Sequence, residues 1–525
     1  MIYLSFAAML LIGVGTVAGL VRCFHMLQQN SYKPERYVAF GKTVKKGRFV
    51  ACLLAALILS ALSFWQQSAL LVLFLVFALL FTLLRIAKNR KEQKKAIKPL
   101  VLTARVKRQF ATAILLLGAD CALWFVLPHL RLVWVSVALF FYAFTPVLAL
   151  LVLFVNMPTE KMVSQHYVND AKRILKQSPN MKIIGVTGSY GKTTTKFIIT
   201  RLLSEKYTVT VTPESFNTPM GVVRTVREKM KAGTEIFVVE MGAKKVGDIK
   251  EICDLVHPTY GVITSVGPQH LDTFHSIENV VKTKFELADC VEQTGGSLYL
   301  NCDSQLIAQN KRESAVCYGT DPSFSAYATD FVCHEGGSTF TVHYKGESIP
   351  LTTRLLGSHN VLNITVAVAV ARDFGVEIPD IQYAVSTLKP TEHRLEVKSF
   401  TAGATLIDDA YNANPEGCLE AVNVLGRFAG KKKIIVTPGL VELGDKEYEC
   451  NYHLGVRAGQ ICDQIVLVGM NRSKPIADGV RSTAFAQENL HVVPSFKDAM
   501  ALITPTLDEN CVVLLENDLP DNYLY

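Results

Sequence analysis

Five apolar stretches within the first 155 residues constrain the fold of this chain more than any other feature. Each is close to the roughly 17–25 residues that span about 30 Å of hydrocarbon, and in lipid a single segment satisfies its own backbone hydrogen bonds only as a helix. The stretches are Tyr3–Arg22, Phe49–Trp65, Ala69–Leu84, Phe110–Pro128 and Leu132–Val155. We therefore expect residues 1–157 to form an α-helical membrane domain with about five transmembrane helices, in contact with membrane lipids.

Two of these assignments involve a choice. Only Gln66-Gln67-Ser68 separates the second stretch from the third, so the two form either a tight helical hairpin, which we favour, or one broken re-entrant element. The first stretch lacks the basic residues that precede the apolar core of a signal peptide. We therefore expect it to be a retained helix.

Positive charge is concentrated in two of the predicted loops, residues 22–48 and 85–108, whereas the other loops carry only Arg131. Because cytoplasmic loops are enriched in Lys and Arg, this asymmetry places the N-terminus outside and everything after Val155 inside the cell. We expect a multi-pass protein of the cell membrane with cytoplasmic catalytic domains, where ATP is available. The two loops account for most of the net charge of +8, so nucleic-acid binding is not needed to explain it.

Asp120 and the cysteines give information on the environment in which the chain folds. Asp120 lies within the fourth stretch, where an ionisable side chain is costly and usually faces protein or a polar path; structural pairing and contact with a lipid substrate both remain open. The 12 cysteines are scattered without a C-x-x-C pair. This pattern favours a reduced compartment, with neither disulfides nor zinc.

After a polar, helical connector at 158–180, apolar strands alternate with helical segments, which is typical of a parallel doubly wound sheet. The first set is Lys182–Val186, Thr208–Val211, Ile236–Glu240, Tyr260–Ser265 and Ser297–Asn301, and a β-rich stretch, Ala326–Tyr344 with Leu351–Leu355, interrupts the pattern. The second set is Ala404–Asp408, Lys433–Val436, Gln464–Val468 and Val512–Leu515. We expect two α/β domains, 181–390 and 391–525.

A glycine-rich run, Gly185–Thr195, lies between the first strand and a helix that begins near Lys196. Glycines at such a turn let backbone N–H groups and the helix N-terminus hold phosphate. Lys192 would then reach the β- and γ-phosphates, and Thr193 would offer its hydroxyl to Mg²⁺. The alternative is an ordinary glycine-rich turn, because Val186 stands where a Walker A motif has its first glycine.

Two later strands end in polar residues at the edge where ligands gather in open α/β sheets. Glu240 closes one strand, and the segment Ser265–Asp272, which contains His270, follows the next. Both side chains are candidates for a Mg²⁺ site. His270 taken alone is also compatible with a hydrogen-bonded core histidine.

Seven motifs in this order resemble the Mur ligases, and the last is most similar to the branch that adds D-alanyl-D-alanine to the peptidoglycan precursor. They are Gly185–Thr194, Glu240–Ala243, Gly267–Leu271, Lys284, Gly357–Asn363, His393–Glu396 and Asp408–Pro415. The resemblance covers roughly residues 181 to 470. It implies a P-loop central domain and a Rossmann-like C-terminal domain, both of the Mur ligase type.

The resemblance also implies roles for individual residues, with ATP and Mg²⁺ as cofactors. Catalytic roles fall to Lys192, His270, Lys284 and Arg394. Nucleotide contacts fall to Gly188, Ser189, Gly191, Lys192, Thr193, Thr194, His359, Asn360, Asn363, Arg394 and Asp409. The metal would be held by Thr193, Glu240 and His270, and substrate by Asn217, Tyr411, Asn412 and Asn414. Lys284 matches a lysine that is carbamylated in several branches; the alternative is a neutral surface lysine.

Three departures from the family pattern concern the substrate. The block Pro438–Gly444 lacks an expected Asp, and Glu516–Asp521 replaces a Lys-Gly-Ser-Arg pattern. Mur ligases also begin with a soluble domain that holds UDP, and apolar stretches occupy that place here. A lipid-linked or polymeric carboxylate acceptor is therefore attractive.

The sequence as a whole predicts a membrane-anchored, ATP-dependent ligase of cell-envelope biosynthesis. It would form an acyl phosphate on a carboxylate and couple it to an amino acid or dipeptide. A synthase of the poly-γ-glutamate type, with export partners, is one alternative. A P-loop ATPase that drives transport or signalling is another.

Overall fold

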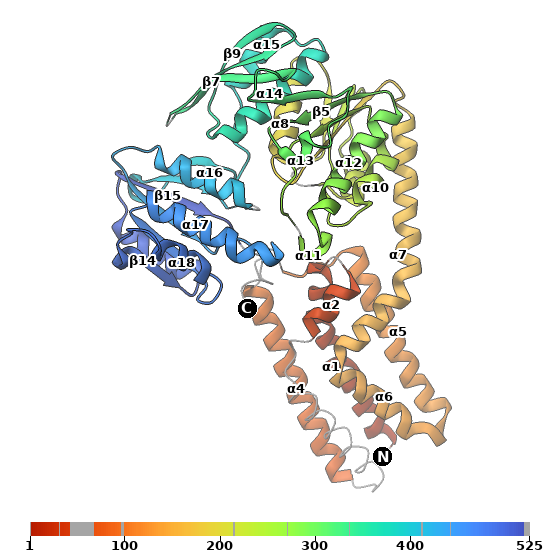
Figure 1. Cartoon of the computed structure of the whole chain (residues 1–525). Coiled ribbons are helices and arrows are strands. Elements are labelled where there is room, and N and C mark those ends of the chain that lie inside the picture. The colour runs from red at the N-terminus through yellow and green to blue at the C-terminus, as the bar shows by residue number, and fades with distance from the viewer. Residues whose placement is uncertain are drawn as a thin grey trace. The chain divides into compact units, whose positions relative to one another are not determined.

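The computed structural model describes residues 2–30, 32–41, 68–95, 99–213, 216–269, 271–334, 336–410, 413–441 and 443–518. The chain divides into two compact units, one that extends to His166 and one from Tyr167 to Leu519 (Figure 1). The first unit is helical, and the second contains both sheets. The predicted division into a helical part and an α/β part is therefore confirmed.

The helices of the first unit include three that are long and apolar enough to cross a membrane, among the residues that the structure describes. They lie within α1 (Ile2–Gln29), α5 (Ala104–Val126) and α7 (Thr145–Lys176). The described part of this unit also contains α2 (Pro34–Gly41), α4 (Ser68–Lys95) and α6 (Arg131–Ala143). The predicted span Phe49–Trp65 lies outside the described residues, and the span Ala69–Leu84 falls within α4.

The last predicted span is wrong as a single helix. Phe144 separates α6 from α7 with φ −112° and ψ 52°, which are not helical angles. Pro146 follows at the start of α7, and proline is tolerated in a first turn because its missing N–H would have no helical partner there. From Thr145 the helix continues to Lys176 without a break at the predicted connector, although Pro158 lies within it.

Contacts between α1 and α4 place a cation against the backbone of a glycine-containing helix. A Cβ atom at Gly19 would lie 2.7 Å from Nη1 of Arg85, so only glycine leaves room for the guanidinium. Arg85 donates to the carbonyl oxygen of Gly15 at 3.0 Å and lies over the Tyr142 ring at 5.0 Å. Asn89, one turn further along α4, donates to the carbonyl of Ala18 at 2.6 Å. Small residues thus permit close helix packing here, as they do in membrane bundles.

Asp120 is buried on α5, with 6% of its surface exposed. Its Oδ1 atom is enclosed and has no hydrogen-bond partner among the described residues. The structural pairing that we considered for this side chain is therefore not present in the described part of the chain.

The first sheet of the second unit has nine strands in the order β2-β3-β1-β4-β5-β6-β7-β8-β9. Strands β1 to β6 pair in parallel, which confirms the predicted parallel sheet, and β7, β8 and β9 pair antiparallel. The β-rich stretch extends this sheet rather than interrupting it, because β7 pairs with β6. The strands are β1 (Lys182–Thr187), β2 (Val209–Val211), β3 (Ile236–Glu240), β4 (Tyr260–Ile263), β5 (Ser297–Asn301), β6 (Val316–Gly319), β7 (Ala326–His334), β8 (Gly337–Tyr344) and β9 (Glu347–Thr353).

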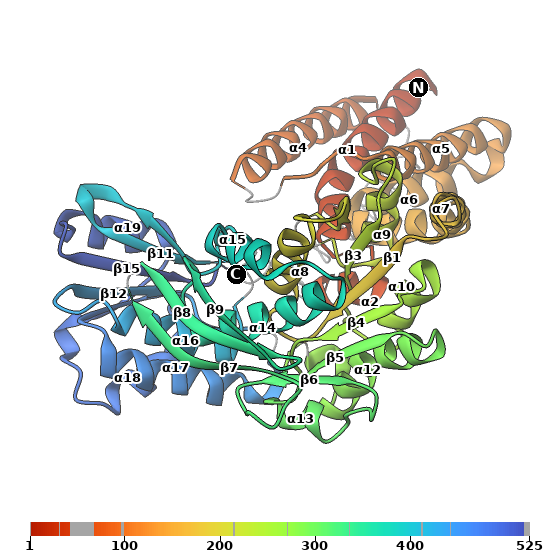
Figure 2. The ribbon, with the colours of Figure 1, turned by 90° about the horizontal axis from the view of Figure 1, so that it is seen from above.

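Helices cover both faces of this sheet, as Figure 2 shows from above. Strand β1 contributes Ile184 and Val186 to the core on one face and Ile183 to the core on the other, as the two-residue period of a strand requires. The first face is covered by α8 (Lys192–Leu203), α14 (Ser358–Asp373) and α15 (Ile378–Ser386). The second is covered by α9 (Pro219–Glu228), α10 (Asp248–Val256) and α12 (Ile277–Gln293).

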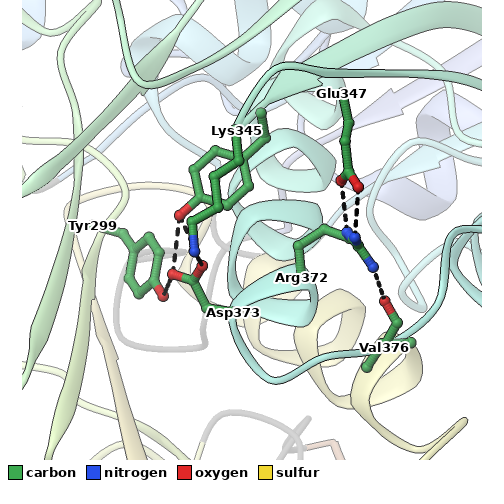
Figure 3. Close-up of polar contacts among 7 residues, drawn as sticks. Tyr299, Lys345, Glu347, Arg372, Asp373 and Val376 are labelled. Carbon is green, nitrogen blue, oxygen red and sulfur yellow. Dashed lines mark hydrogen bonds and ion pairs between the residues drawn. The ribbon is translucent and has the colours of Figure 1, made fainter.

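The C-terminal end of α14 is fixed to neighbouring strands by the polar contacts of Figure 3. The Asp373 carboxylate accepts hydrogen bonds from the Tyr299 hydroxyl at 2.5 Å and from the Lys345 ammonium at 2.6 Å. Arg372 makes two parallel bonds to Glu347, at 2.8 and 2.7 Å. Such paired contacts add geometric specificity, so they set the position of a helix whose other end carries the predicted nucleotide residues.

A six-stranded second sheet has the order β10-β11-β15-β12-β13-β14 and is parallel except for β10. It confirms the predicted Rossmann-like C-terminal fold. Its strands are β10 (Glu396–Ser399), β11 (Thr405–Asp409), β12 (Lys432–Thr437), β13 (Gln464–Val468), β14 (Leu490–Val493) and β15 (Cys511–Glu516). Its helices are α16 (Pro415–Gly426), α17 (Glu447–Ile461), α18 (Lys474–Arg481) and α19 (Phe496–Ile503).

The expectation that the chain has no disulfide is wrong for one pair of cysteines. Cys302, just after β5, is joined to Cys317 of β6. The two strands are neighbours in parallel register, with Leu300 opposite Cys317, so the two Cα atoms lie 5.6 Å apart. Spacing along the sequence could not reveal a pairing that depends on strand order.

Candidate active site

The glycine-rich run forms the predicted turn between a strand and a helix. Strand β1 ends at Thr187, and α8 begins at Lys192. Gly188 and Gly191 have φ values of 155° and 77°, and a Cβ atom at Gly188 would lie 2.1 Å from Oγ1 of Thr264. Glycine is required at both positions because L side chains are disfavoured at these angles.

The turn is anchored to the loop that follows β4. The backbone N–H of Ser189 donates to the carbonyl of Ser265 at 2.8 Å, and that of Tyr190 donates to the Ser265 hydroxyl at 2.7 Å. The Ser189 hydroxyl donates to the Gly267 carbonyl at 3.1 Å. The predicted nucleotide residue Ser189 therefore uses its side chain to hold the turn, and it is almost fully buried.

Lys192 lies over the turn, with its ammonium 2.8 Å from the carbonyl oxygen of Ser189. Burial lowers the pKa of Lys192 to about 8, against the opposing effect of Glu240. Thr193 and Thr194 follow in the first turn of α8. A helix N-terminus with a lysine beside it is a suitable environment for phosphate, so the geometry agrees with the predicted role of this segment.

Glu240 is placed beside the turn because β3 pairs with β1, with Glu240 opposite Val186. Only 1% of its surface is exposed. Its Oε2 atom accepts from Nζ of Lys196 at 3.0 Å, and its Oε1 atom accepts from Nδ2 of Asn217 at 3.0 Å. Burial opposes ionisation of this carboxyl, but Lys196 and Lys192 together lower its pKa. Glu240 is therefore an ionised carboxylate inside the protein.

Lys196 was missed as a site residue by sequence reasoning. It is completely buried and forms an ion pair with Glu240. The available signal was its position one helical turn after Lys192, on the same side of a helix whose first turn faces the phosphate loop.

The predicted magnesium site is described only in part. His270 lies outside the described residues, and within the described ranges no group of three or more His, Cys, Asp or Glu side chains is placed to hold a metal. Thr193 and Glu240 both belong to the edge of the sheet that carries the turn. A hydroxyl and an ionised carboxylate are oxygen ligands of the kind that Mg²⁺ prefers, so these residues fit the ion.

Lys284 of α12 has 3% of its surface exposed, which excludes the alternative of a surface lysine. Burial lowers the pKa of Lys284 well below its ordinary range, and the positive charge of Lys192 acts in the same direction. The side chain is therefore held as a neutral amine more readily than a lysine in water.

A cavity brings together residues from the first sheet domain and the C-terminal domain of the second unit. The turn contributes Tyr190, and α16 contributes Glu416 and Glu420, which sequence reasoning missed. Eight predicted residues border the cavity: Gly191, Thr194, His359, Asn360, Asn363, Arg394, Asp409 and Asn414. Seven others do not line it, among the residues that the structure describes: Gly188, Ser189, Lys192, Thr193, Asn217, Glu240 and Lys284. Tyr411 and Asn412 lie outside the described residues.

The wall formed by α14 carries connected polar groups. Oδ1 of Asn363 accepts from the Thr195 hydroxyl at 2.9 Å, and Nδ2 of Asn363 donates to Asn360 at 3.3 Å. Burial lowers the pKa of His359, which favours its neutral form. Nδ1 of His359 is enclosed and has no hydrogen-bond partner among the described residues. An unsatisfied ring nitrogen at the cavity wall is suited to a ligand with hydrogen-bonding groups, as a nucleotide has.

The C-terminal domain supplies the opposite wall. Oδ1 of Asp409 accepts from the backbone N–H of Leu395 at 3.1 Å, and burial raises the pKa of Asp409 to about 6. Asn414 caps α16, with Oδ1 accepting from the N–H of Gly417 at 2.9 Å. The proposed substrate contact of Asn414 therefore coexists with a structural role. Asn217 is likewise engaged, through its bond to Glu240.

A glycine-rich phosphate turn and a second Rossmann-like domain that border one cavity define a two-domain α/β protein with a nucleotide-type site. Residues 186–371 match the Mur ligase middle domain, and residues 393–516 match the glutamate ligase domain of the Mur ligases. The chain belongs to the Mur ligase family through these two domains, which together occupy more than half of its length.

Curated relatives include UDP-N-acetylmuramoyl-tripeptide–D-alanyl-D-alanine ligases. The protein from Bacillus subtilis is 35% identical over 272 residues, which are 52% of this chain and 59% of that protein. The protein from Mycobacterium tuberculosis is 30% identical over 304 residues, 56% of this chain and 59% of that protein. The chain thus spans about three fifths of the length of these relatives.

Solved structures show the same fold. MurF from Acinetobacter baumannii superposes with a TM-score of 0.60 at 24% identity, over 68% of this chain and 78% of that chain. MurF ligase from Thermotoga maritima, in complex with ADP, superposes with a TM-score of 0.59 at 25% identity, over 67% of this chain and 80% of that chain.

The buried ion pair predicts the effect of removing one partner. Lys196→Met should lower the free energy of unfolding by about 3–5 kcal/mol, because Glu240 would remain buried without its cation. The double variant Lys196→Met/Glu240→Leu should regain much of this loss, since no charge is left uncompensated. Denaturant unfolding of the purified protein measures both values.

The matched control is Lys250→Met, which removes a lysine from the exposed pair with Asp254 on α10. This change should have no measurable effect. Equal losses for the two lysines would contradict the proposed importance of the buried pair.

Proposed function

We propose that this chain is an ATP-dependent amide ligase, similar to MurF, that activates a carboxylate and couples it to an amine. The observation that carries the proposal is the shared cavity, which the phosphate turn borders at Gly191 and the C-terminal domain borders at Arg394 and Asp409. A nucleotide held there contacts two domains. Enclosure of this kind keeps water away from the hydrolysable acyl phosphate that the reaction needs.

The reaction has two steps. An oxygen of the substrate carboxylate attacks the γ-phosphorus of ATP, ADP leaves, and an acyl phosphate forms. The amine then attacks the acyl carbon, phosphate leaves, and the amine nitrogen gives up a proton as the amide forms. Lys192 and the N-terminus of α8 stabilise negative charge on the transferring group. Mg²⁺, when bound, supplies further charge neutralisation, and Thr193, Glu240 and His270 are the residues that would hold it.

Lys284 fits a further feature of this reaction type. A neutral amine can react with carbon dioxide to give a carbamate anion and a released proton, and the depressed pKa of Lys284 favours the neutral amine. We include carbamylated Lys284 in the proposal as an anion that would help to hold the metal.

The acceptor is proposed to be lipid-linked or polymeric. Three described helices are apolar and long enough to cross a bilayer, and confinement to one surface raises the effective concentration of a lipid substrate. The names of the relatives instead specify a UDP-linked tripeptide and D-alanyl-D-alanine. The chain departs from the pattern of that branch in the segment from Glu516 onward. Envelope-biosynthesis proteins are the expected partners.

The nucleotide chemistry is tested with Lys192→Ala. Loss of one oriented electrostatic group typically costs about 10²–10³ in rate, so release of ADP should fall by at least this factor. Lys250→Met serves as the control, because its exposed lysine lies on α10. In the wild type, ADP release should require both carboxylate and amine; ATP hydrolysis that continues without an amine would favour an ATPase motor.

The membrane arrangement is tested by cysteine labelling. The basic loops predict a cytoplasmic location for Lys94 and an external one for His129. A membrane-impermeant thiol reagent added to intact cells should therefore modify His129→Cys and leave Lys94→Cys unmodified, each measured against the wild-type background. The reverse pattern would contradict the proposed orientation.

The acceptor class is tested by competition. The full chain, reconstituted in lipid with ATP, Mg²⁺ and amino acids or dipeptides, should ligate lipid-linked or polymeric carboxylates in preference to UDP-linked ones. Product formation is followed by mass spectrometry. Efficient coupling of D-alanyl-D-alanine to UDP-N-acetylmuramoyl-tripeptide would show that the enzyme shares the substrate of its relatives.

A further inference from the structure

Strands β11 and β15 both end in an acidic residue at the carboxyl edge of the second sheet. Their parallel register pairs Asp409 with Glu516. Asn517, which follows with a φ of 64°, donates its backbone N–H to the Asp409 carbonyl at 3.2 Å and its side-chain amide to the Gly439 carbonyl at 2.6 Å. These bonds fix the two strand ends beside each other, so the two carboxyl groups are neighbours by construction of the sheet.

Glu516 is sealed inside the domain. None of its surface is exposed, and Oε1 accepts from the thiol of Cys418 at 2.8 Å. Oε2 is enclosed and has no hydrogen-bond donor among the described residues. Asp409, in contrast, borders the cavity. One acid of the pair therefore faces the proposed nucleotide site, and the other lies behind it.

The charged and titratable groups around the pair are Arg394, Cys418 and Asp408. Asp408 is already engaged, because it accepts from His393 at 2.8 Å and from Lys398 at 3.1 Å. Burial raises the pKa of Glu516 well above its ordinary range, although Arg394 opposes this effect. Two neighbouring acids in a poorly solvated place cannot both ionise easily, and they retain a proton between them.

We propose that Glu516 makes the charge at the nucleotide site depend on pH: while the Asp409–Glu516 pair holds one proton, the two acids carry a single negative charge, and loss of that proton adds a second. This role rests on the proposed function, because the phosphates of a nucleotide are repelled by a second full negative charge.

The pair predicts how pH affects nucleotide binding. When the pH rises far enough for the pair to lose its last proton, the wild-type pair gains a second negative charge, and the affinity of the protein for ADP should fall. In Glu516→Gln, Asp409 is left with a single negative charge on both sides of this change. The ratio of the wild-type Kd to the variant Kd should therefore rise by about tenfold from the lower pH to the higher. Because both Kd values are measured at the same pH with the same ligand, their ratio is unaffected by the ionisation of ADP itself or of groups that both proteins share.

Isothermal titration of the full-length protein in detergent with ADP and Mg²⁺ measures this ratio. Glu509→Gln, which changes an exposed acid close to the start of β15, is the matched control and should give a ratio that does not change with pH.

Thermal unfolding supplies a second readout. Because folding favours the protonated pair, wild-type stability is lost as pH rises, and Glu516→Gln should become the more stable protein at alkaline pH. If Glu516→Gln does not fold, Asp409→Asn removes the other acid and should abolish the same alkaline loss of affinity.

The outcomes separate the two proposals. Folded wild-type protein that binds no ADP at any pH would overturn the proposed function and this role with it. Binding of ADP with a ratio that stays constant across the pH range would overturn the role of Glu516 alone. A rising ratio, with the control flat, supports it.

Discussion

The site depends on a charge buried within the first sheet domain. Glu240 ends β3, the neighbour of β1 in the sheet, and it stays ionised because Lys196 is buried with it. A lone carboxylate in this place would be expelled or protonated. The pair also ties α8 to β3, so the helix that begins at the phosphate turn is fixed to the strand that delivers the carboxylate. One contact thus stabilises both the ionised carboxylate of Glu240 and the position of α8 against the sheet.

Much of the α/β unit could be predicted from its sequence, since local patterns determine local structure. The apolar strands and the turn at Gly188 and Gly191 depend on residue type and spacing alone. The partners of Glu240 could not be read in this way. A carboxylate at a strand end looks the same whether it binds a metal or a lysine, and only the packing of α8 against the sheet reveals Lys196. Similarly, Cys302 and Cys317 meet because of strand order, which spacing does not encode.

The helical first unit was predictable in composition but less so in its boundaries. Hydropathy recognises apolar segments, yet it does not register the break at Phe144, since both sides are equally apolar. It also does not register that α7 continues past its apolar part to Lys176, because helix continuity depends on backbone hydrogen bonds rather than on polarity. Arg85, counted among loop charges, proves to lie against the backbone of α1. Charge counts are therefore a weak guide to where a helix ends.

The side-chain cap at the amino end of α14 predicts how a nucleotide is oriented in the cavity. Oε1 of Glu420, from the C-terminal domain, accepts from the Ser358 N–H at 2.9 Å and from the Ser358 hydroxyl at 3.0 Å. A carboxylate of the protein thus neutralises the partial positive charge of this helix end. The amino end of α8 has no such side-chain cap. Of the three helix amino ends at the cavity, those of α14 and α16 carry side-chain caps, from Glu420 and Asn414. Only that of α8 is left to attract an anion, so a nucleotide would enter with its phosphates toward α8 and its base toward His359, and not the other way round.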